Sequence, residues 1–358
     1  MRRLAKAIGI LLALALAGAL VLGFWPMTNR WVHAAHPVPL PVAPIPNAEA
    51  LTAYIQRNRP GIDAFVIHKD GALAFSYGAA DVPMALASGR KSVLSLLYGI
   101  AWDRGLIDLH KTLKDLRIDE SATPLTDTEK RATIENLLES RSGVYLPSGA
   151  ESPQMKAARP NRGQYSPGEN FYYNNWDFNV LGTIFESQTH MTVANALEQW
   201  LAQPLGMEDF APTHVRFDRE GETDYPTYRI HMSARDFARI GTLILQNGTW
   251  NGKRIVSEAW LTKSFTPSST FETAGWGFAS DAYGYSWWLN TVEDAVIADG
   301  WGGQYLYVDR RNKIVFVSRC DIGNSLLGFQ WFQRFKQPGD PARLLALRDL
   351  ALSVYRVP

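Results

Sequence analysis

Cysteine, surplus charge and metal-ligand spacings are nearly absent from this sequence. Its 358 residues include a single cysteine, Cys320, which excludes an intrachain disulfide framework and any zinc or iron–sulfur site built from several cysteines. Lys and Arg number 36 and Asp and Glu 35, so the formal net charge is +1, and no long basic run offers nucleic acid a surface. The seven histidines never stand in a His-x-His or His-Glu-x-x-His spacing. We therefore expect no metal and no nucleic-acid partner.

The motifs of several large enzyme classes are also missing. No Gly-x-Ser-x-Gly occurs, which argues against an α/β-hydrolase. No Gly-x-Gly-x-x-Gly follows a predicted strand and no Walker A lysine loop is present, so we expect no nucleotide or other cofactor. The remaining composition, 46% hydrophobic and 20% charged, is ordinary for a folded globular protein.

The N-terminal segment is the first distinctive feature. Basic residues at positions 2, 3 and 6 precede an uncharged apolar run from Ala7 to Trp25, nineteen residues counted inclusively. A helix that spans a bilayer needs about 20 residues, whereas a secretory h-region has about 7–15. Residues 1–30 therefore predict a signal anchor, with a cleaved signal peptide as the alternative. We expect the rest of the chain in the bacterial periplasm, anchored to the inner membrane by the N-terminal helix, or secreted if the segment is cleaved.

Two further segments complete the expected organisation. Five prolines between His36 and Asn47 predict that residues 31–47 form an extended, semi-rigid stalk with no core of its own. The composition is even from about residue 48 onward, so residues 48–358 are expected to form one folded domain.

Local patterns in that domain predict an α+β fold. Two pairs of apolar runs flank short turns and predict β-hairpins: Ala64–His68 with Ala72–Tyr77, and Gln304–Val308 with Lys313–Val317. A mostly apolar helix is expected from about Ser88 to Arg104, and a closing helix to about Tyr355 with Asp340 as its N-cap. Since the strands lie near both chain ends, we expect one antiparallel sheet built from both ends, flanked by helices, with an inserted, mainly helical region.

The first candidate for chemistry is the Ser-x-x-Lys pair of Ser88 and Lys91. Residues i and i+3 at the start of a helix lie on one face, within hydrogen-bonding range. A lysine in an apolar site can lose its proton near neutral pH and act as a base toward the serine hydroxyl. The alternative is that Ser88 is only a helix N-cap, the commonest role of a serine at that position.

Two more segments carry polar or flexible groups suited to a site. Tyr173 and Asn175 form a Tyr-x-Asn pair that can present a phenol and an amide to one pocket, although Tyr172 and Asn174 form the same pattern. An aromatic loop leading into a packed helix is the alternative. Near the C-terminus, the run from Trp301 to Gln304 reads Trp-Gly-Gly-Gln. Its backbone N–H groups could form an oxyanion hole with that of Ser88, or the run could be a plain glycine-rich turn.

The order and flanks of these three segments resemble the serine β-lactamase and penicillin-binding-protein superfamily, in particular its class C-like esterase and amidase branch, which includes the 6-aminohexanoate-dimer hydrolases. The resemblance covers Ala64 to Val317. Leu137–Gly143 resembles the family's "LL…SG" loop, and Met232–Ile240 resembles its later Ser-x-x-Asp-x-x-Arg helix.

The resemblance implies a role for each motif residue. Ser88 would be the nucleophile, Lys91 its general base, Tyr173 the proton relay and Asn175 the paired amide. Tyr173 is preferred to Tyr172 because its nine-residue spacing to a glycine fits the family pattern. The backbone N–H groups of Ser88 and Gln304 would form the oxyanion hole, and the segment in front of Gln304 would contact substrate: Trp301, Gly302 and Gly303.

This last segment departs from the pattern of the antibiotic-recognising members, which carry Lys-Thr-Gly there. Without that lysine and threonine, a substrate carboxylate loses a cation and a hydroxyl. We therefore expect a serine hydrolase that cleaves a small ester, amide or peptide substrate through an acyl-enzyme. A β-lactamase, a D-Ala-D-Ala peptidase and a non-catalytic protein that binds penicillin or peptidoglycan are the alternatives.

Overall fold

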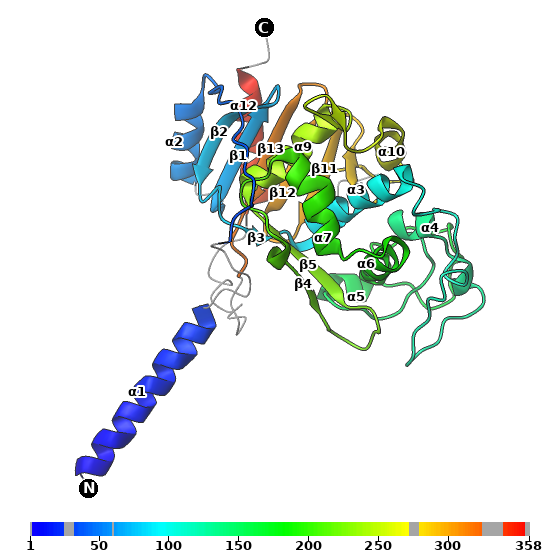
Figure 1. The fold of residues 1–358 in the computed structure, drawn as a ribbon, viewed down its shortest axis with the longest axis horizontal. Coiled ribbons are helices and arrows are strands. Elements are labelled where there is room, and N and C mark those ends of the chain that lie inside the picture. Colours follow the sequence, from blue (N-terminus) through cyan, green and yellow to red (C-terminus); the bar gives the residue numbers. More distant parts are fainter. Residues whose placement is uncertain (1, 25–31, 59–60, 272–278, 324–338, 355–358) are drawn as a thin grey trace.

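The computed structural model describes residues 2–24, 32–58, 61–271, 279–323 and 339–354. Its largest element is an eight-stranded antiparallel sheet (Figure 1). From one edge to the other, the strands are β2 (Ala72–Gly78), β1 (Ala64–Lys69), β13 (Ile314–Arg319), β12 (Gln304–Asp309), β11 (Ala295–Gly300), β10 (Trp288–Asn290), β9 (Ala282–Tyr283) and β8 (Ser269–Thr270).

The centre of the sheet joins the two ends of the domain. Both predicted hairpins are present, as β1–β2 and β12–β13. Strand β1 pairs with β13 along its whole length, from Ala64 opposite Arg319 to Lys69 opposite Ile314. This pairing confirms the α+β prediction of one antiparallel sheet assembled from distant parts of the chain.

Three helices cover the sheet near this junction. Helices α2 (Ala48–Asn58) and α12 (Pro341–Ser353) pack together, and α12 begins as predicted with Asp340, whose carboxylate accepts a hydrogen bond of 3.0 Å from the Ala342 N–H. Helix α9 (Ala234–Leu245) lies across β1, β12 and β13. It approaches closely because residue 241 is glycine, where a Cβ would lie 2.5 Å from the Val315 side chain.

The inserted region is mainly helical, as expected, and also contains two small sheets: β3 (Met84–Ala85), β5 (Thr227–Met232) and β4 (Val215–Asp218) in one, and β6 (Thr249–Trp250) with β7 (Lys253–Arg254) in the other. Its helices are α3 (Arg90–Asp103), α4 (Ile134–Leu138), α5 (Pro153–Ala158), α6 (Asn175–Thr189), α7 (Val193–Ala196), α8 (Gln203–Leu205) and α10 (Glu258–Ser264), with a π-helical stretch at Leu197–Ala202. Helix α3 is buried along almost its entire length, which matches its apolar sequence.

Helix α1 (Arg2–Phe24) contains most of the predicted apolar run. Within the part of the chain that the structure describes, no helix has the length and apolarity needed to cross a membrane. The predicted signal anchor therefore gains no support from the structure, and the position of the domain outside the cytoplasm stays a prediction.

The proline-rich segment is extended, but it does not stand apart as a free stalk. Its backbone pairs with β2: the Leu73 N–H donates to the Pro41 carbonyl at 2.9 Å, and the Ala43 N–H donates to the Leu73 carbonyl at 3.0 Å. Ile45 is only 2% exposed and joins the hydrophobic core. The correction has a physical cause, because an edge strand such as β2 presents unpaired backbone groups that an extended neighbour can satisfy.

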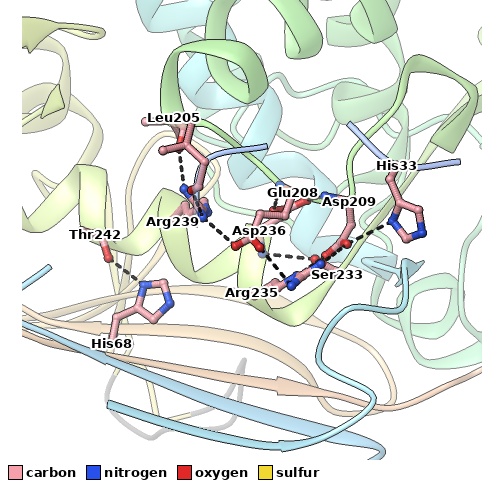
Figure 2. Close-up of polar contacts among 11 residues, drawn as sticks. His33, His68, Leu205, Glu208, Asp209, Ser233, Arg235, Asp236, Arg239 and Thr242 are labelled. Atoms are coloured by element: carbon pink, nitrogen blue, oxygen red, sulfur yellow. Dashed lines mark hydrogen bonds and ion pairs between the residues drawn. The ribbon is translucent and has the colours of Figure 1, made fainter. Parts of the chain in front are cut away.

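A second contact holds the same segment to α9 (Figure 2). The Arg239 guanidinium donates to the carbonyl of Val38 and to the carboxylate of Glu208, both at 2.7 Å. Asp236 accepts the backbone N–H groups of Glu208 and Asp209 at 2.7 and 2.9 Å. The Ser-x-x-Asp-x-x-Arg pattern of this helix thus ties α9 to the chain that precedes it and has no part in the site described next.

Candidate active site

Ser88 lies in a 3₁₀ turn, Ala87–Gly89, that leads directly into α3. Its hydroxyl oxygen is 3.2 Å from the Lys91 amine. The residue that precedes α3 is Gly89, and no side chain caps either the turn or the helix. Ser88 is therefore not the helix N-cap that its position in the sequence would also allow, and its hydroxyl faces the lysine.

Lys91 is the centre of the cluster. Its Nζ atom lies 2.7 Å from the Tyr173 hydroxyl and 2.7 Å from Asn175 Oδ1, and the residue is 2% exposed. The rings of Tyr173 and Phe178 lie against the amine, with centroids at 3.9 and 4.2 Å. The structure thus brings together the four side chains that the sequence singled out.

The number and kind of these partners fit a neutral amine. A neutral amine has two N–H donors and one lone pair, whereas an ammonium group has three donors and no acceptor. The amide oxygen of Asn175 can only accept, and the Tyr173 hydroxyl can take the second N–H. The lone pair then remains for the proton of Ser88, at a distance suited to general base catalysis.

Burial favours the uncharged form of both the Lys91 amine and the Tyr173 phenol. It lowers the pKa of Lys91 well below its usual value, and the neighbouring Arg90 charge lowers it further, while Asp299 acts in the opposite sense. Burial also raises the pKa of Tyr173 above its usual value. Both shifts favour the uncharged forms, an amine that can accept a proton and a phenol that can donate one.

The structure distinguishes the two Tyr-x-Asn patterns. The Tyr172 hydroxyl donates to the Met155 carbonyl at 2.8 Å, away from the lysine. Asn174 caps α6 by accepting the Trp176 N–H at 3.1 Å. Tyr173 and Asn175 are therefore the pair at the site.

Asn175 is held in one orientation. Its Nδ2 donates to the Ala150 carbonyl at 2.6 Å, and a carbonyl can only accept. The amide oxygen must then point toward Lys91, where it accepts at 2.7 Å. The loop that contains Ala150 thus fixes which end of the amide faces the amine.

The loop that carries Tyr173 is held by the segment Leu137–Gly143. The Ser140 hydroxyl donates to the Tyr172 carbonyl at 2.7 Å and accepts the Asn174 N–H at 2.9 Å. The Ser142 hydroxyl donates to the buried Asp177 carboxylate at 2.6 Å. The "LL…SG" segment therefore positions the tyrosine loop against α3.

The end of β11 lies beside the 3₁₀ turn of Ser88. A Cβ on Gly300 would collide with the Leu86 carbonyl oxygen, and one on Gly89 would lie 4.0 Å from the Ala298 side chain. Strand β10 pairs with β11 only as far as Ile297, so it leaves the last three residues of β11 uncovered on that edge. The strand edge next to Ser88 is thus Ala298–Gly300.

This arrangement differs from the predicted place of the Trp-Gly-Gly-Gln run. Trp301, Gly302 and Gly303 form the turn after β11, and the Trp301 side chain is 66% exposed. Gln304 begins β12, whose neighbours in the sheet are β11 and β13, and its side chain bonds the backbone of Cys320. The approach of Gly300 to the Leu86 carbonyl places the end of β11 beside the Ser88 turn, and the predicted role of the Gln304 N–H stays a prediction.

A cavity of about 550 Å³ adjoins the cluster on the side of Tyr173. Residues of the loop before α6 line it together with Arg141 and residues of β8. Its lining includes Phe171, Tyr172, Tyr173 and Phe271, together with Arg141 and Ser269. The Arg141 guanidinium connects these two parts of the chain, since it donates to the Gly168 and Ser268 carbonyls at 3.0 Å each. The lining also contains Glu169, Asn170 and Thr270, so the cavity beside Tyr173 combines aromatic faces with polar groups.

Two charged residues near Lys91 had no assigned role in the sequence. Arg90 was part of the Ser-x-x-Lys motif, and its position next to the lysine was the available signal. Nothing in the local sequence marked Asp299. Both act on the charge of the Lys91 amine.

Comparison with known proteins settles the family. A family model described as Beta-lactamase matches residues 46–318, which is most of the chain. The chain belongs to the Beta-lactamase family. This membership confirms the resemblance drawn from the motifs, and the fold agrees with it.

Individual relatives of this Beta-lactamase family member carry hydrolase names. A 6-aminohexanoate-dimer hydrolase from Paenarthrobacter ureafaciens is 30% identical over 161 residues, which are 44% of this chain and 40% of that relative. The chain thus matches two fifths of the length of this curated relative. A Bacillus anthracis structure named for the same hydrolase has a TM-score of 0.61 at 21% identity and covers 93% of this chain and 91% of its own. A family VIII carboxylesterase has a TM-score of 0.60 at 15% identity, covering 88% and 100%. The two structures show the shared fold, and the hydrolase names support the prediction of a serine hydrolase.

Proposed function

We propose that this member of the Beta-lactamase family is a serine hydrolase that cleaves an ester or amide bond through an acyl-enzyme on Ser88. The observation that carries the proposal is the buried Lys91 amine, which lies within hydrogen-bond distance of Ser88, Tyr173 and Asn175. A lone serine next to a lysine would be weak evidence. The amide and the phenol account for the two N–H groups of the amine and leave its lone pair for the serine proton.

The first half of the reaction forms the acyl-enzyme. Lys91 takes the proton of Ser88 as the serine oxygen attacks the substrate carbonyl and a tetrahedral intermediate forms. When this intermediate collapses, the bond to the leaving group breaks, and the leaving group takes the Tyr173 proton. The proton on Lys91 then returns the phenol to its neutral form over the 2.7 Å contact.

The second half releases the acid. Water attacks the ester carbonyl of the acyl-enzyme and gives its proton to the same base, and the Ser88 oxygen leaves and regains a proton. The nucleophile, base and phenol are thereby restored, and no group beyond this chain and water is needed.

We place the oxyanion between the Ser88 N–H and the Trp301 N–H, rather than the Gln304 N–H predicted from the sequence. Among the residues that the structure describes, neither the Ser88 N–H nor the Trp301 N–H donates a hydrogen bond to another group. Trp301 follows Gly300, which packs against the backbone two residues before Ser88. A tetrahedral oxyanion requires two backbone donors beside the attacking oxygen.

The proposed substrates are esters and amides without a carboxylate next to the scissile bond. The strand edge beside Ser88 reads Ala298-Asp299-Gly300, so it offers no cation and carries an acidic side chain. A carboxylate held there would be repelled by Asp299, which disfavours the β-lactam and D-Ala-D-Ala substrates. The hydrolase and carboxylesterase names of the relatives agree with this choice. From the N-terminal sequence we further propose that the reaction occurs in the periplasm.

The test is covalent labelling of the full chain. A fluorophosphonate probe should add one adduct to the intact mass of the wild-type protein, and Ser88→Ala should abolish the adduct. Lys91→Ala should slow labelling by a factor on the order of 10²–10⁴ while the protein stays folded, because the base would be missing. Folded wild-type protein without any adduct would overturn the enzyme assignment and favour a binding protein.

A further inference from the structure

Arg90 is a buried cation without an acidic partner. The residue is 2% exposed, and its guanidinium lies over the Tyr228 ring with its Cζ 4.7 Å from the centroid. It donates to the amide oxygen of Asn179 at 3.0 Å, and its Nε is buried with no acceptor. Among the described residues, no carboxylate forms an ion pair with it.

Burying the Arg90 charge without an ion pair lowers the stability of the folded protein. A buried charge loses its hydration, and proteins usually compensate with a salt bridge and a full set of hydrogen bonds. Here the compensation comes from an aromatic face and an amide, both of which are uncharged. They hold the guanidinium in place without neutralising it, so its electric field persists in a region of low dielectric constant.

The residue next to Arg90 in the chain is Lys91, which is equally buried. Both side chains reach one face of α6, because Lys91 bonds Asn175 and Arg90 bonds the residue one helical turn further on, Asn179. Two basic side chains so placed in a buried region repel each other strongly when both are protonated. Arginine keeps its proton under nearly all conditions, whereas a buried lysine loses its proton readily. The repulsion is therefore relieved at the lysine, which is the side chain within reach of Ser88.

We propose that Arg90 is a positioning residue for the reaction, whose unpaired buried charge keeps the Lys91 amine deprotonated and so available as the base for Ser88. This inference rests on the proposed function. It assigns a role to a residue that touches neither the nucleophile nor the relay.

Other groups that face Lys91 do not supply the same effect. Tyr173, Asn175 and Phe178 are uncharged neighbours. Arg229, on β5, has the same sign as Arg90, but its guanidinium is paired with Asp218 at 3.0 Å and Glu220 at 2.6 Å.

Among the described residues, two acidic groups act in the opposite sense: Asp299 on β11 acts on Lys91, and Glu220 acts on Arg90 itself while it pairs with Arg229. The Asp299 carboxyl is only partly buried, so solvent screens its effect on the amine. Within the described part of the chain, Arg90 is thus a buried positive charge near Lys91 that forms no ion pair.

The test measures how the rate of Ser88 labelling depends on pH. The rate of fluorophosphonate labelling should rise with pH as Lys91 loses its proton, and the midpoint of that rise reports the lysine. In the double variant Arg90→Met/Asn179→Leu, both hydrogen-bonding partners become apolar, so no buried amide oxygen is left without a donor. We expect its midpoint to move up by on the order of one pH unit, with about tenfold slower labelling below both midpoints.

A second variant neutralises the charge of Arg90 without removing the arginine. Asn179→Asp places a carboxylate where an amide now accepts from Arg90 at 3.0 Å, and the new ion pair should cancel much of the field. The midpoint should again move up. Asn179→Ser is the matched neutral control and should leave the midpoint in place.

The possible results distinguish a failure of the proposed hydrolase function from a failure of the role assigned to Arg90. Wild-type protein that fails to label at any pH would overturn the proposed function itself. A wild-type protein that labels normally, beside either charge variant folded by circular dichroism with an unshifted midpoint, would show that Arg90 has only a structural role. A loss of thermal stability without a change of midpoint counts against the proposal in the same way.

Discussion

The Lys91 amine and the Tyr173 hydroxyl lie 2.7 Å apart, and both residues are buried. Burial lowers the pKa of the lysine and raises that of the tyrosine, so the contact joins a neutral base to a neutral acid. A proton can pass between two such groups without creating a long-lived buried charge. The predictions below depend on this pairing or on the fold that maintains it.

The first prediction concerns the pH dependence of catalysis. The value of kcat/KM should rise with pH as Lys91 loses its proton, because only the neutral amine can act as base. Asp299 raises the pKa of Lys91, so Asp299→Asn should lower it and move the acid limb of the profile to lower pH, by on the order of 0.5 pH unit. The measurement is kcat/KM for a neutral ester across the pH range.

A matched control for this prediction stands at the other end of the same strand. Asp294 precedes β11 and forms an ion pair with Arg310. Asp294→Asn removes the same charge without placing the change near Lys91, and its profile should coincide with that of the wild type. A shift of equal size in both variants would mean that overall charge, not the position of Asp299, sets the midpoint.

The second prediction separates the two adjacent tyrosines. Tyr173→Phe should lower kcat by a factor on the order of 10²–10⁴, because the leaving group would lose its proton donor. Tyr172→Phe should cost far less, since that hydroxyl donates to the Met155 carbonyl and not to Lys91. Steady-state kinetics of the two variants, with thermal unfolding as a check of folding, decide the point. A larger loss for Tyr172→Phe would reverse the assignment.

Local sequence patterns predicted much of the fold and most of the site. The hairpins of β1–β2 and β12–β13 depend on neighbouring residues and short turns, so periodicity was sufficient to find them. Ser88 and Lys91 are related by one helical turn, and Tyr173 and Asn175 lie in one loop. The resemblance to a family supplied what spacing could not, namely that these two segments meet.

The remaining features depend on contacts between distant segments. Which strand lies beside Ser88 depends on how the sheet packs against the Ser88 turn, and the glycine spacing around Gly302 carries no information on that packing. Asp299 has no local pattern that marks it. The proline-rich segment reads as extended in isolation, and only the open edge of β2 shows where it lies. In each case the local conformation could be predicted, but the distant segment that it contacts could not.

The third prediction concerns stability in acid. His68 lies on β1 and is buried, with its Nδ1 3.0 Å from the Thr242 hydroxyl of α9 (Figure 2). Burial lowers the pKa of His68 to about 3, and it lowers that of His231 to the same value. As the pH falls below about 6.5, the unfolded chain binds protons that the folded protein excludes, so the free energy of unfolding decreases by about 1.4 kcal/mol per pH unit for each histidine.

The variant His68→Gln isolates one of these two contributions. Glutamine keeps a hydrogen-bonding group near Thr242 but does not titrate. Between pH 7 and pH 5, the variant should lose about 2 kcal/mol less unfolding free energy than the wild type. Urea unfolding at the two pH values provides the measurement. Equal losses in both proteins would mean that His68 is protonated in the folded state.

The last prediction concerns the charge of the substrate. Two esters with the same leaving group, one neutral and one with a carboxylate near the scissile carbonyl, should differ in kcat/KM by about tenfold or more in favour of the neutral ester. The physical reason is that the strand edge beside Ser88 carries Asp299 and no cation. Asp299→Asn should narrow the difference, because it removes the repulsion without adding a carboxylate-binding group. If the wild type instead prefers the carboxylate-bearing ester, a cation from another segment must hold that carboxylate, and β-lactams and D-Ala-D-Ala peptides become the substrates to examine.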